Sequence, residues 1–293
     1  MAAREIYSAL VTPYGAHGGV DRDGLGRLLE FQRAMGLSGV YVGGSSGEAM
    51  LQTVDERADV IKAVAELNPG IKLIAHIGAI ATRDALSLSD AANESGYDAV
   101  SAISPFYYTF SDSELVRHYY AIADRSAVPL VVYSFPAKGL GLTPELCTTL
   151  LAHPNIAGVK YTSADLYMLD TLKRANPGKI FYNGFDEIFL AGLSMGADGA
   201  IGTTYNFMGD VFCAIDAAFA EGRMAEALEL QGMANAIIAK LYRSIISGTK
   251  YVLARMDVPV GGTRLPIEDV DWAAVPGLQA DIDGLTAWRE SRR

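Results

Sequence analysis

The stretch Ile156-Ala157-Gly158-Val159-Lys160-Tyr161-Thr162-Ser163 is the one around which the rest of the chain is organised. Its first four residues are apolar and follow a proline-containing segment, 153–155, so they predict a buried strand. A lysine at the end of such a strand is unusual, because burying an unpaired ammonium is unfavourable and lowers its pKa. A neutral lysine can attack a carbonyl group and form a Schiff base. The alternative interpretation is that Lys160 only marks the point where the strand meets solvent.

Segments of strand and helix character alternate on both sides of this stretch. Apolar segments predict strands over 5–12, 40–42, 71–77, 98–103, 128–133, 156–160, 179–182 and 198–201, with helix-like segments between them. Eight such units with short connections predict parallel strands joined by right-handed crossovers, which is the pattern of an α/β TIM (β/α)8 barrel. An open doubly wound sheet is the alternative, but the turn after the first strand, Thr12-Pro13-Tyr14-Gly15, is not a glycine-rich phosphate turn. We expect the barrel over 1–206 and extra C-terminal helices over 207–293 that complete it and pack on it.

The composition limits the classes of function. The chain has 293 residues, of which 50% are hydrophobic and 20% charged, an ordinary globular balance. A net charge of −10 argues against nucleic acid and anionic membranes as partners. Arg4 and Glu5 precede any apolar run, and no apolar run has the length of a bilayer span, so we expect neither a signal peptide nor a membrane segment. Cys147 and Cys213 stand alone, which favours a reducing compartment, the cytoplasm.

Polar residues gather where the strands of the expected barrel end. In this fold the active site is built from the loops at the C-terminal ends of the strands. Those places hold Ser45 and Ser46 after the second strand, Tyr107 after the fourth, Tyr133 on the fifth, Lys160 and Thr162 on the sixth, Asp186 and Glu187 after the seventh, and Thr203 and Thr204 after the eighth. So many coincidences favour Lys160 as a catalytic residue.

Each of these residues also has a structural interpretation. The Gly43–Gly47 loop can direct backbone N–H groups and two hydroxyls at an anion, or it can be a flexible turn. Tyr133 can relay a proton beside an amine, or it can be a core residue whose hydroxyl needs a partner. Asp186 and Glu187 can bind substrate hydroxyls, or they can be first-turn acids favoured by the helix dipole.

Metal and cofactor chemistry find little support in the sequence. The four histidines, at 17, 76, 118 and 153, are scattered and have no ligand partner at a useful spacing, so no metal is expected. A lysine Schiff base on a barrel can also hold pyridoxal phosphate, but no glycine-rich phosphate cradle follows the seventh and eighth strands. We therefore expect no cofactor.

Two signatures carry a family resemblance. The stretch Tyr41-Val42-Gly43-Gly44-Ser45-Ser46-Gly47-Glu48 resembles the GxxGE signature of the dihydrodipicolinate synthase and N-acetylneuraminate lyase superfamily. Tyr133 and the stretch 158–163 match its second signature, and the resemblance covers nearly the whole chain. Further stretches are similar to the N-acetylneuraminate lyase branch: 104–108, 165–167, 182–187 and 202–206.

This resemblance implies a class I aldolase on a homotetrameric TIM barrel, with sialic acid and pyruvate as small-molecule ligands. It implies that Lys160 forms the Schiff base with pyruvate and that Tyr133 moves the proton. It implies that Ser45 and Ser46 hold the carboxylate, and that Tyr107 comes from a neighbouring subunit to complete a hydroxyl relay with Ser46 and Tyr133. Residues implied to contact the sugar's hydroxyls are Thr162, Gly184, Asp186, Glu187 and Thr203. The implied reaction is the reversible cleavage of N-acetylneuraminate to N-acetylmannosamine and pyruvate.

Three positions depart from the branch. Thr203 stands where these lyases have serine, and Ser134 where they usually have asparagine. Lys138 stands where the lyases have an apolar residue and the synthases have an arginine that binds a second carboxylate. A lysine is a poor replacement for a bidentate arginine. Two alternatives therefore stay open: another pyruvate-dependent aldolase of the superfamily, such as dihydrodipicolinate synthase or a 2-keto-3-deoxy sugar acid aldolase, and a non-catalytic ligand-binding homologue.

Overall fold

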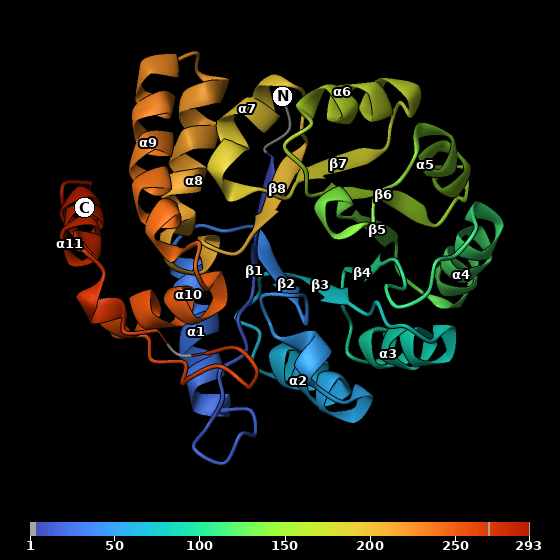
Figure 1. The fold of residues 1–293 in the computed structure, drawn as a ribbon, viewed down its shortest axis with the longest axis horizontal. Coiled ribbons are helices and arrows are strands. Elements are labelled where there is room, and N and C mark those ends of the chain that lie inside the picture. Colours follow the sequence, from blue (N-terminus) through green and yellow to red (C-terminus); the bar gives the residue numbers. More distant parts are fainter. Residues whose placement is uncertain (1–3, 269, 293) are drawn as a thin grey trace.

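The structure, a computed structural model, describes residues 4–268 and 270–292. Within them eight parallel strands pair in chain order and β8 closes onto β1 (Figure 1). The strands are β1 Glu5–Ala9, β2 Gly39–Val42, β3 Lys72–His76, β4 Ala99–Ile103, β5 Leu130–Ser134, β6 Ile156–Tyr161, β7 Ile180–Asn183 and β8 Gly199–Gly202. The predicted TIM barrel is therefore confirmed.

Helices follow the strands and surround the barrel (Figure 1). They are α1 Arg22–Ala34, α2 Val54–Glu66, α3 Thr82–Glu94, α4 Asp112–Arg125, α5 Pro144–Leu151, α6 Leu166–Ala175, α7 Phe189–Ser194, α8 Tyr205–Ala220, α9 Met224–Leu241, α10 Ile245–Arg255 and α11 Leu278–Glu290. Short 3₁₀ helices are η1 Ala49–Leu51, η2 Pro136–Lys138, η3 Asp186–Ile188 and η4 Trp272–Ala274.

Local sequence signals explain the starts of α1 and α2. The Asp21 side chain caps α1 by accepting a hydrogen bond from the Gly24 N–H. Thr53 and Glu56 form the capping box that the sequence predicts for α2. Such caps satisfy N–H groups that have no partner inside the helix.

The strand register places Lys160 inside the barrel. On β5 and β6, Val131 pairs with Gly158, and Tyr133 pairs with Lys160. Val131 belongs to the small apolar cluster that fills the barrel interior. Side chains two residues apart on a strand share a face, so Tyr133 and Lys160 also point inward, nearer the C-terminal end of the barrel.

Strand β6 is one residue longer than the sequence suggested, so Lys160 lies inside the strand and not at its end. The ladder continues because Ser134 O accepts a hydrogen bond from the Thr162 N–H and Tyr161 O accepts one from the Gly184 N–H. Lys160 and the next residue, Tyr161, are both buried, so the interpretation that Lys160 marks where the strand meets solvent was wrong.

The C-terminal helices continue the barrel's own core. Figure 1 shows α8, α9, α10 and α11 on one side of the barrel, with α9 beside α8 and α11 on the outer side of α9. One apolar cluster runs from Ile6 on β1 to Leu285 on α11. The boundary predicted between 206 and 207 lies within α8, and the division of the chain there stays a prediction. In the part of the chain that the structure describes, no helix is both long enough and apolar enough to cross a bilayer.

Candidate active site

A cavity of about 300 Å³ opens at the C-terminal ends of the strands. This volume is at the lower end of the range for small-molecule sites, roughly 300–1,000 Å³. The residues predicted to be catalytic or to bind substrate that line it are Ser45, Ser46, Tyr133, Lys160, Thr162, Gly184, Asp186, Glu187 and Thr203. The fold thus brings nine residues from five strand-loop units into one place.

Lys160 lies in the wall of this cavity and is only 6% exposed. Its Nζ lies 4.3 Å from the centroid of the Tyr133 ring and 4.6 Å from that of Tyr41. Burial lowers the pKa of Lys160 to about 7, against a smaller opposing attraction from the Asp186 carboxylate. A large fraction of this amine is therefore unprotonated near neutral pH, and an unprotonated amine is nucleophilic.

Tyr133 sits beside Lys160 with its ring fixed by other rings. It packs edge-on against Tyr41 and His76 and stacks on Phe135. Burial raises the pKa of Tyr133 to about 12, while the hydroxyls of Thr162 and Ser45 act to lower it. The phenol is therefore protonated at neutral pH and has hydroxyl neighbours with which a proton can be exchanged.

The Gly43–Gly47 loop joins β2 to η1 and is held in consecutive turns. Gly47 N–H donates to Gly44 O at 3.1 Å, and Glu48 N–H donates to Ser45 O at 3.0 Å. The buried His76 fixes the other end, because its Nδ1 lies 3.0 Å from Gly43 O. The alternative interpretation of this loop as a flexible turn has no support in these contacts.

The Ser46 and Thr203 hydroxyls lie 2.7 Å apart and are hydrogen-bonded to each other. The family resemblance assigned Ser46 to a carboxylate and Thr203 to a sugar hydroxyl. Their contact joins the loop after β2 to the loop after β8.

Asp186 is buried and already engaged. Its Oδ2 accepts hydrogen bonds from the Thr204 N–H at 2.7 Å and the Thr204 hydroxyl at 2.6 Å. Burial raises the pKa of Asp186 to about 6; the Thr204 contacts lower it, Glu187 raises it and Lys160 lowers it. Asp186 is therefore the carboxylate that acts electrostatically on the Lys160 amine.

Glu187 faces the C-terminal helices and accepts a hydrogen bond from the Tyr242 hydroxyl. That contact raises the pKa of Tyr242 to about 12. The backbone is also held, since Asn235 Nδ2 donates to Glu187 O at 3.0 Å and Gln231 Nε2 donates to Asp186 O at 3.1 Å. Both carboxylates of η3 thus line the cavity, and side chains of α9 bind the backbone carbonyl groups of the same two residues.

Two glycines are required by close approaches in this site. A Cβ on Gly184 would lie 2.0 Å from Thr162 Oγ1, and one on Gly202 would lie 2.1 Å from Asp186 Oδ1. Any larger side chain would therefore push a cavity residue out of place.

Tyr107 is the one predicted catalytic residue that does not line this cavity. It is 74% exposed and packs edge-on against Tyr108, with ring centroids 4.9 Å apart. It lines a separate cavity next to Lys138, which itself lines both cavities. A role for Tyr107 in a relay with Ser46 stays a prediction that needs a second copy of the chain.

Sequence reasoning missed the residues that close the cavity from the C-terminal side. They are Ile238, Tyr242, Ile245 and Ile246, on α9, α10 and the turn between them. Their helical spacing indicated only that these helices bury one face. An aromatic residue at a helix junction, such as Tyr242, was the available signal, but nothing local says which cavity it faces.

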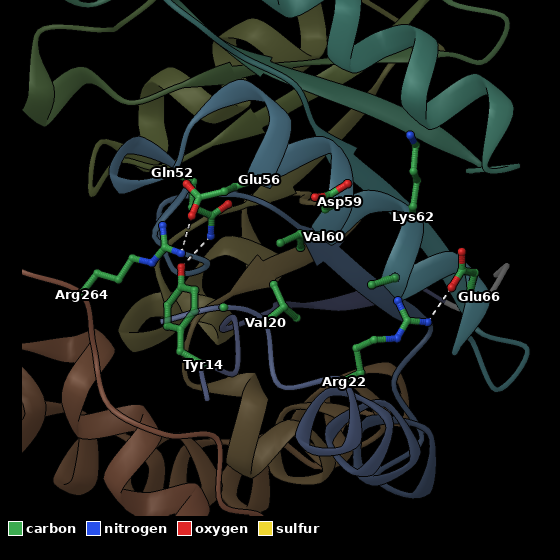
Figure 2. A pocket seen from close by; sticks show the side chains of 12 residues that line it. Tyr14, Val20, Arg22, Gln52, Glu56, Asp59, Val60, Lys62, Glu66 and Arg264 are labelled. Atoms are coloured by element: carbon green, nitrogen blue, oxygen red, sulfur yellow. Dashed lines mark hydrogen bonds and ion pairs between the residues drawn. The ribbon is translucent and has the colours of Figure 1, made fainter. Parts of the chain in front are cut away.

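A second cavity, of about 380 Å³, lies outside the barrel between α1, α2 and the C-terminal segment (Figure 2). Two ion pairs lie in its wall: Arg22 with Glu66 at 2.5 Å, and Arg264 with Glu56 at 2.7 Å. It contains none of the sequence-predicted site residues. In the described residues, no group of three or more His, Cys, Asp or Glu side chains is placed to hold a metal ion.

The family model described as "Dihydrodipicolinate synthetase family" matches residues 2–284. A protein of Rhizobium meliloti (strain 1021) named N-acetylneuraminate lyase is 52% identical over 99% of this chain and 98% of its own length.

Solved structures agree with this match. A sialic acid aldolase of Ruminococcus gnavus has a TM-score of 0.93 at 28% identity, over 99% of each chain. A dihydrodipicolinate synthase of Bacillus anthracis has a TM-score of 0.91 at 23% identity, over 97% of this chain and 98% of that one, so the fold alone does not separate the activities. The chain belongs to the dihydrodipicolinate synthetase family.

Proposed function

We propose that this protein is a class I aldolase that reversibly cleaves N-acetylneuraminate to N-acetylmannosamine and pyruvate. The observation that carries the proposal is the buried Lys160 amine, whose pKa is lowered to about 7 at the wall of a polar cavity. The names of the relatives give the substrate, since the Rhizobium meliloti protein is an N-acetylneuraminate lyase and the Ruminococcus gnavus protein a sialic acid aldolase.

The chemistry follows from an amine beside a protonated phenol. Lys160 attacks the C2 ketone of the open-chain sugar acid, and loss of water gives an iminium ion. As the C3–C4 bond breaks, the Tyr133 phenol passes its own proton to the substrate carboxylate and takes up the proton of the C4 hydroxyl, and the iminium accepts the electron pair as an enamine. The aldehyde, N-acetylmannosamine, leaves; protonation at C3 and hydrolysis then release pyruvate and the free amine.

The remaining cavity residues bind the two ends of the substrate. Ser45 and Ser46 hold the carboxylate next to the reacting ketone. Thr162, Gly184, Asp186, Glu187 and Thr203 contact the hydroxyls of the sugar tail. Two observations support this assignment of a carboxylate end and a sugar end. The serine loop after β2 lies beside Tyr133, and Asp186 and Glu187 follow β7.

We further propose that the chain works as a homotetramer in the cytoplasm. The exposed Tyr107 and Tyr108 form an aromatic surface that a second copy of the chain would cover, and Tyr107 would then complete the relay with Ser46 and Tyr133. The two free cysteines, Cys147 and Cys213, suit a reducing compartment.

One observation favours a different aldehyde partner. Lys138 lines the cavity and offers a positive charge that an uncharged sugar aldehyde does not need. An aldehyde that carries its own carboxylate would pair with this charge. Such an aldehyde is the substrate expected if the chain is another pyruvate-dependent aldolase. Pyruvate release from a panel of sialic and 2-keto-3-deoxy acids separates the two, as does condensation of pyruvate with aspartate semialdehyde. Ligand binding without any pyruvate release would instead indicate a non-catalytic homologue.

The decisive experiment is borohydride reduction in the presence of pyruvate, followed by peptide mapping. We expect a covalent adduct on Lys160 and none in the Lys160→Arg variant, because a guanidinium stays protonated. The chain supplies internal controls: Lys173 pairs with Asp198 at 2.6 Å and Lys250 pairs with Glu48 at 2.7 Å. An adduct on either of these lysines, or no adduct, would contradict the proposal.

A further inference from the structure

Glu48 ends the serine loop in a backbone conformation that needs outside support. Its φ of 61° and ψ of 29° are in the left-handed region, which is disfavoured for residues with a Cβ. Its N–H donates to Ser45 O at 3.0 Å, so this conformation belongs to the same turn that presents the serine hydroxyls. Disfavoured backbone persists where the surrounding structure holds it.

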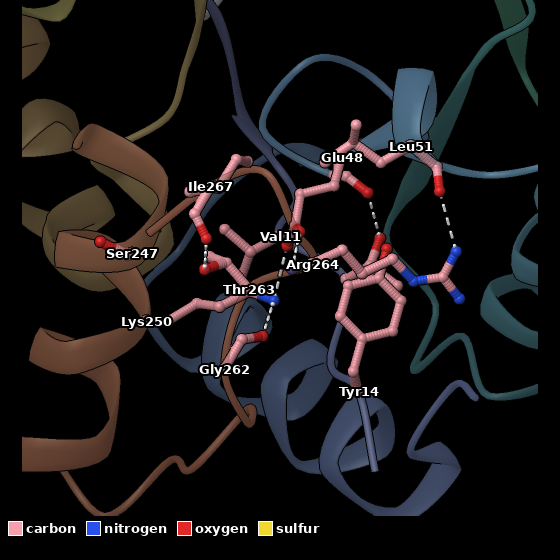
Figure 3. Close-up of polar contacts among 12 residues, drawn as sticks. Val11, Tyr14, Glu48, Leu51, Ser247, Lys250, Gly262, Thr263, Arg264 and Ile267 are labelled. Carbon is pink, nitrogen blue, oxygen red and sulfur yellow. Dashed lines mark hydrogen bonds and ion pairs between the residues drawn. The ribbon is translucent and has the colours of Figure 1, made fainter. Parts of the chain in front are cut away.

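The Glu48 side chain makes two contacts that can hold this backbone conformation. It is fully buried, and its Oε1 lies 2.7 Å from Lys250 Nζ, whose side chain is 3% exposed. Its Oε2 accepts a hydrogen bond from the Arg264 N–H at 2.7 Å. Figure 3 shows Glu48 facing Lys250 and the backbone of the C-terminal segment 262–264.

The partners of Glu48 are themselves fixed. Lys250, on α10, donates to Gly262 O at 2.7 Å and lies 4.5 Å from the centroid of the Tyr14 ring. The Arg264 guanidinium donates to Leu51 O at the end of η1, at 3.0 Å. Arg264 therefore holds the loop after β2 at two points: its N–H binds the Glu48 side chain, and its guanidinium binds the end of η1.

Helix α10 connects this support to the cavity. Ile245 and Ile246 in its first turn line the cavity that contains Lys160, and Lys250 lies further along the same helix. A buried ion pair is a poor means of adding stability, because desolvating both charges offsets most of their attraction. The more specific effect of this pair is to fix the position of the loop relative to α10.

We propose that the Glu48–Lys250 ion pair positions the Ser45–Ser46 loop for carboxylate binding, with both charged residues acting as positioning residues outside the reaction itself. This inference rests on the proposed function, in which that loop binds the carboxylate of pyruvate. Loss of the pair releases the turn from α10 and moves the serine hydroxyls, while Lys160 and Tyr133 keep their places on β6 and β5.

The test measures borohydride trapping of pyruvate against pyruvate concentration, in variants of the full chain. Glu48→Gln combined with Lys250→Met removes both charges at once, so that no unpaired charge is left buried. Glu48→Asp keeps the charge but shortens its reach, and serves as a milder variant should the double variant not fold. The matched control replaces another ion pair that holds a C-terminal helix, Arg289 with Asp210 at 2.6 Å, by Met and Asn.

We expect the pyruvate concentration for half-maximal trapping to rise roughly tenfold or more in the double variant, since misplacing a binding group by about an ångström can cost up to 10²-fold. The trapping rate at saturating pyruvate should stay close to wild-type, and the control should keep the wild-type half-saturation. A purely structural role would lower the melting temperature and leave half-saturation unchanged; that result in any folded Glu48 variant overturns the inference. Absence of trapping in the wild-type protein would instead count against the proposed function.

Discussion

Burial and strand register determine the surroundings of Lys160 and Tyr133. Their pairing on β5 and β6 places the phenol beside the amine, and the same burial moves their pKa values apart, to about 7 and about 12. A neutral amine next to a protonated phenol is the combination that Schiff-base chemistry needs near neutral pH.

Replacing Tyr133 by phenylalanine tests the phenol separately from the ring. Phenylalanine fills nearly the same volume and keeps the contacts with Tyr41, His76 and Phe135, so little loss of stability is expected. Turnover of N-acetylneuraminate should fall by roughly 10²-fold or more, the usual range for loss of a general acid–base. The measurement is kcat alongside the melting temperature; a variant with nearly wild-type kcat would make Tyr133 a core residue only.

Replacing Asp186 by asparagine tests the carboxylate as the electrostatic partner of Lys160. Attraction by Asp186 raises the pKa of Lys160 against the effect of burial, so its removal should lower that pKa further. The rate of pyruvate trapping should therefore rise with pH through a midpoint below that of wild-type, which we expect near pH 7. The difference should fade below about pH 6, where Asp186 itself becomes protonated.

Glu187→Gln is the matched control for this variant, because Glu187 neighbours Asp186 and is not among the groups that shift the pKa of Lys160. It should leave the trapping midpoint in place. Both variants should lower kcat/KM for N-acetylneuraminate by about ten- to a hundredfold if the carboxylates bind sugar hydroxyls. An unchanged midpoint in Asp186→Asn would refute the electrostatic role.

Strand and helix periodicity was sufficient to predict the barrel and the loops that line its cavity. Lys160, Thr162 and Asp186 could be placed from sequence because a parallel barrel brings the ends of all its strands to one face. The walls contributed by α9 and α10 could not be placed, because Tyr242 and Ile245 reach the cavity through packing between distant segments. Nor could sequence show that Asp186 is bound by Thr204, a contact between the loops after β7 and β8.

The support that α9 gives to η3 leads to a prediction about specificity. Gln231 donates to Asp186 O and accepts from the Leu190 N–H at 3.0 Å, so it fixes the start of η3 to the start of α7. Gln231→Leu removes both contacts, so that Asp186 O keeps only the Phe189 N–H as a donor and Leu190 N–H loses its side-chain acceptor, and η3 should shift. KM for N-acetylneuraminate should rise several-fold, while half-saturation of pyruvate trapping stays at its wild-type value.

The exposed Glu229 on the same helix provides the control, since Glu229→Gln should change neither constant. If Gln231→Leu raised the pyruvate constant as much as the constant for the sugar acid, η3 would not be specific to the sugar end of the site.

Burial of the Lys160 amine lowers the stability of the folded chain. In the unfolded chain Lys160 is charged below about pH 10.5, whereas in the folded protein burial lowers its pKa to about 7. Between these values the unfolded state binds a proton that the folded state does not, so stability falls as pH decreases from 10.5 to 7. Below pH 7 the penalty is complete, on the order of a few kcal/mol.

Lys160→Met should therefore raise the melting temperature at pH 7 by several degrees, because methionine has a similar length and no charge to desolvate. The gain should shrink as pH rises toward 10.5, where the wild-type lysine is neutral in both states. Lys173→Met is the control: Lys173 is half-buried and paired with Asp198, so its loss should not raise the melting temperature. Calorimetry at fixed protein concentration from pH 7 to 10 measures both.

Equal melting temperatures of wild-type and Lys160→Met at pH 7 would show that the fold stabilises the ammonium, and an ammonium could not be the nucleophile. A higher value in the inactive variant would mean that the chain gives up stability to keep a neutral amine in its cavity.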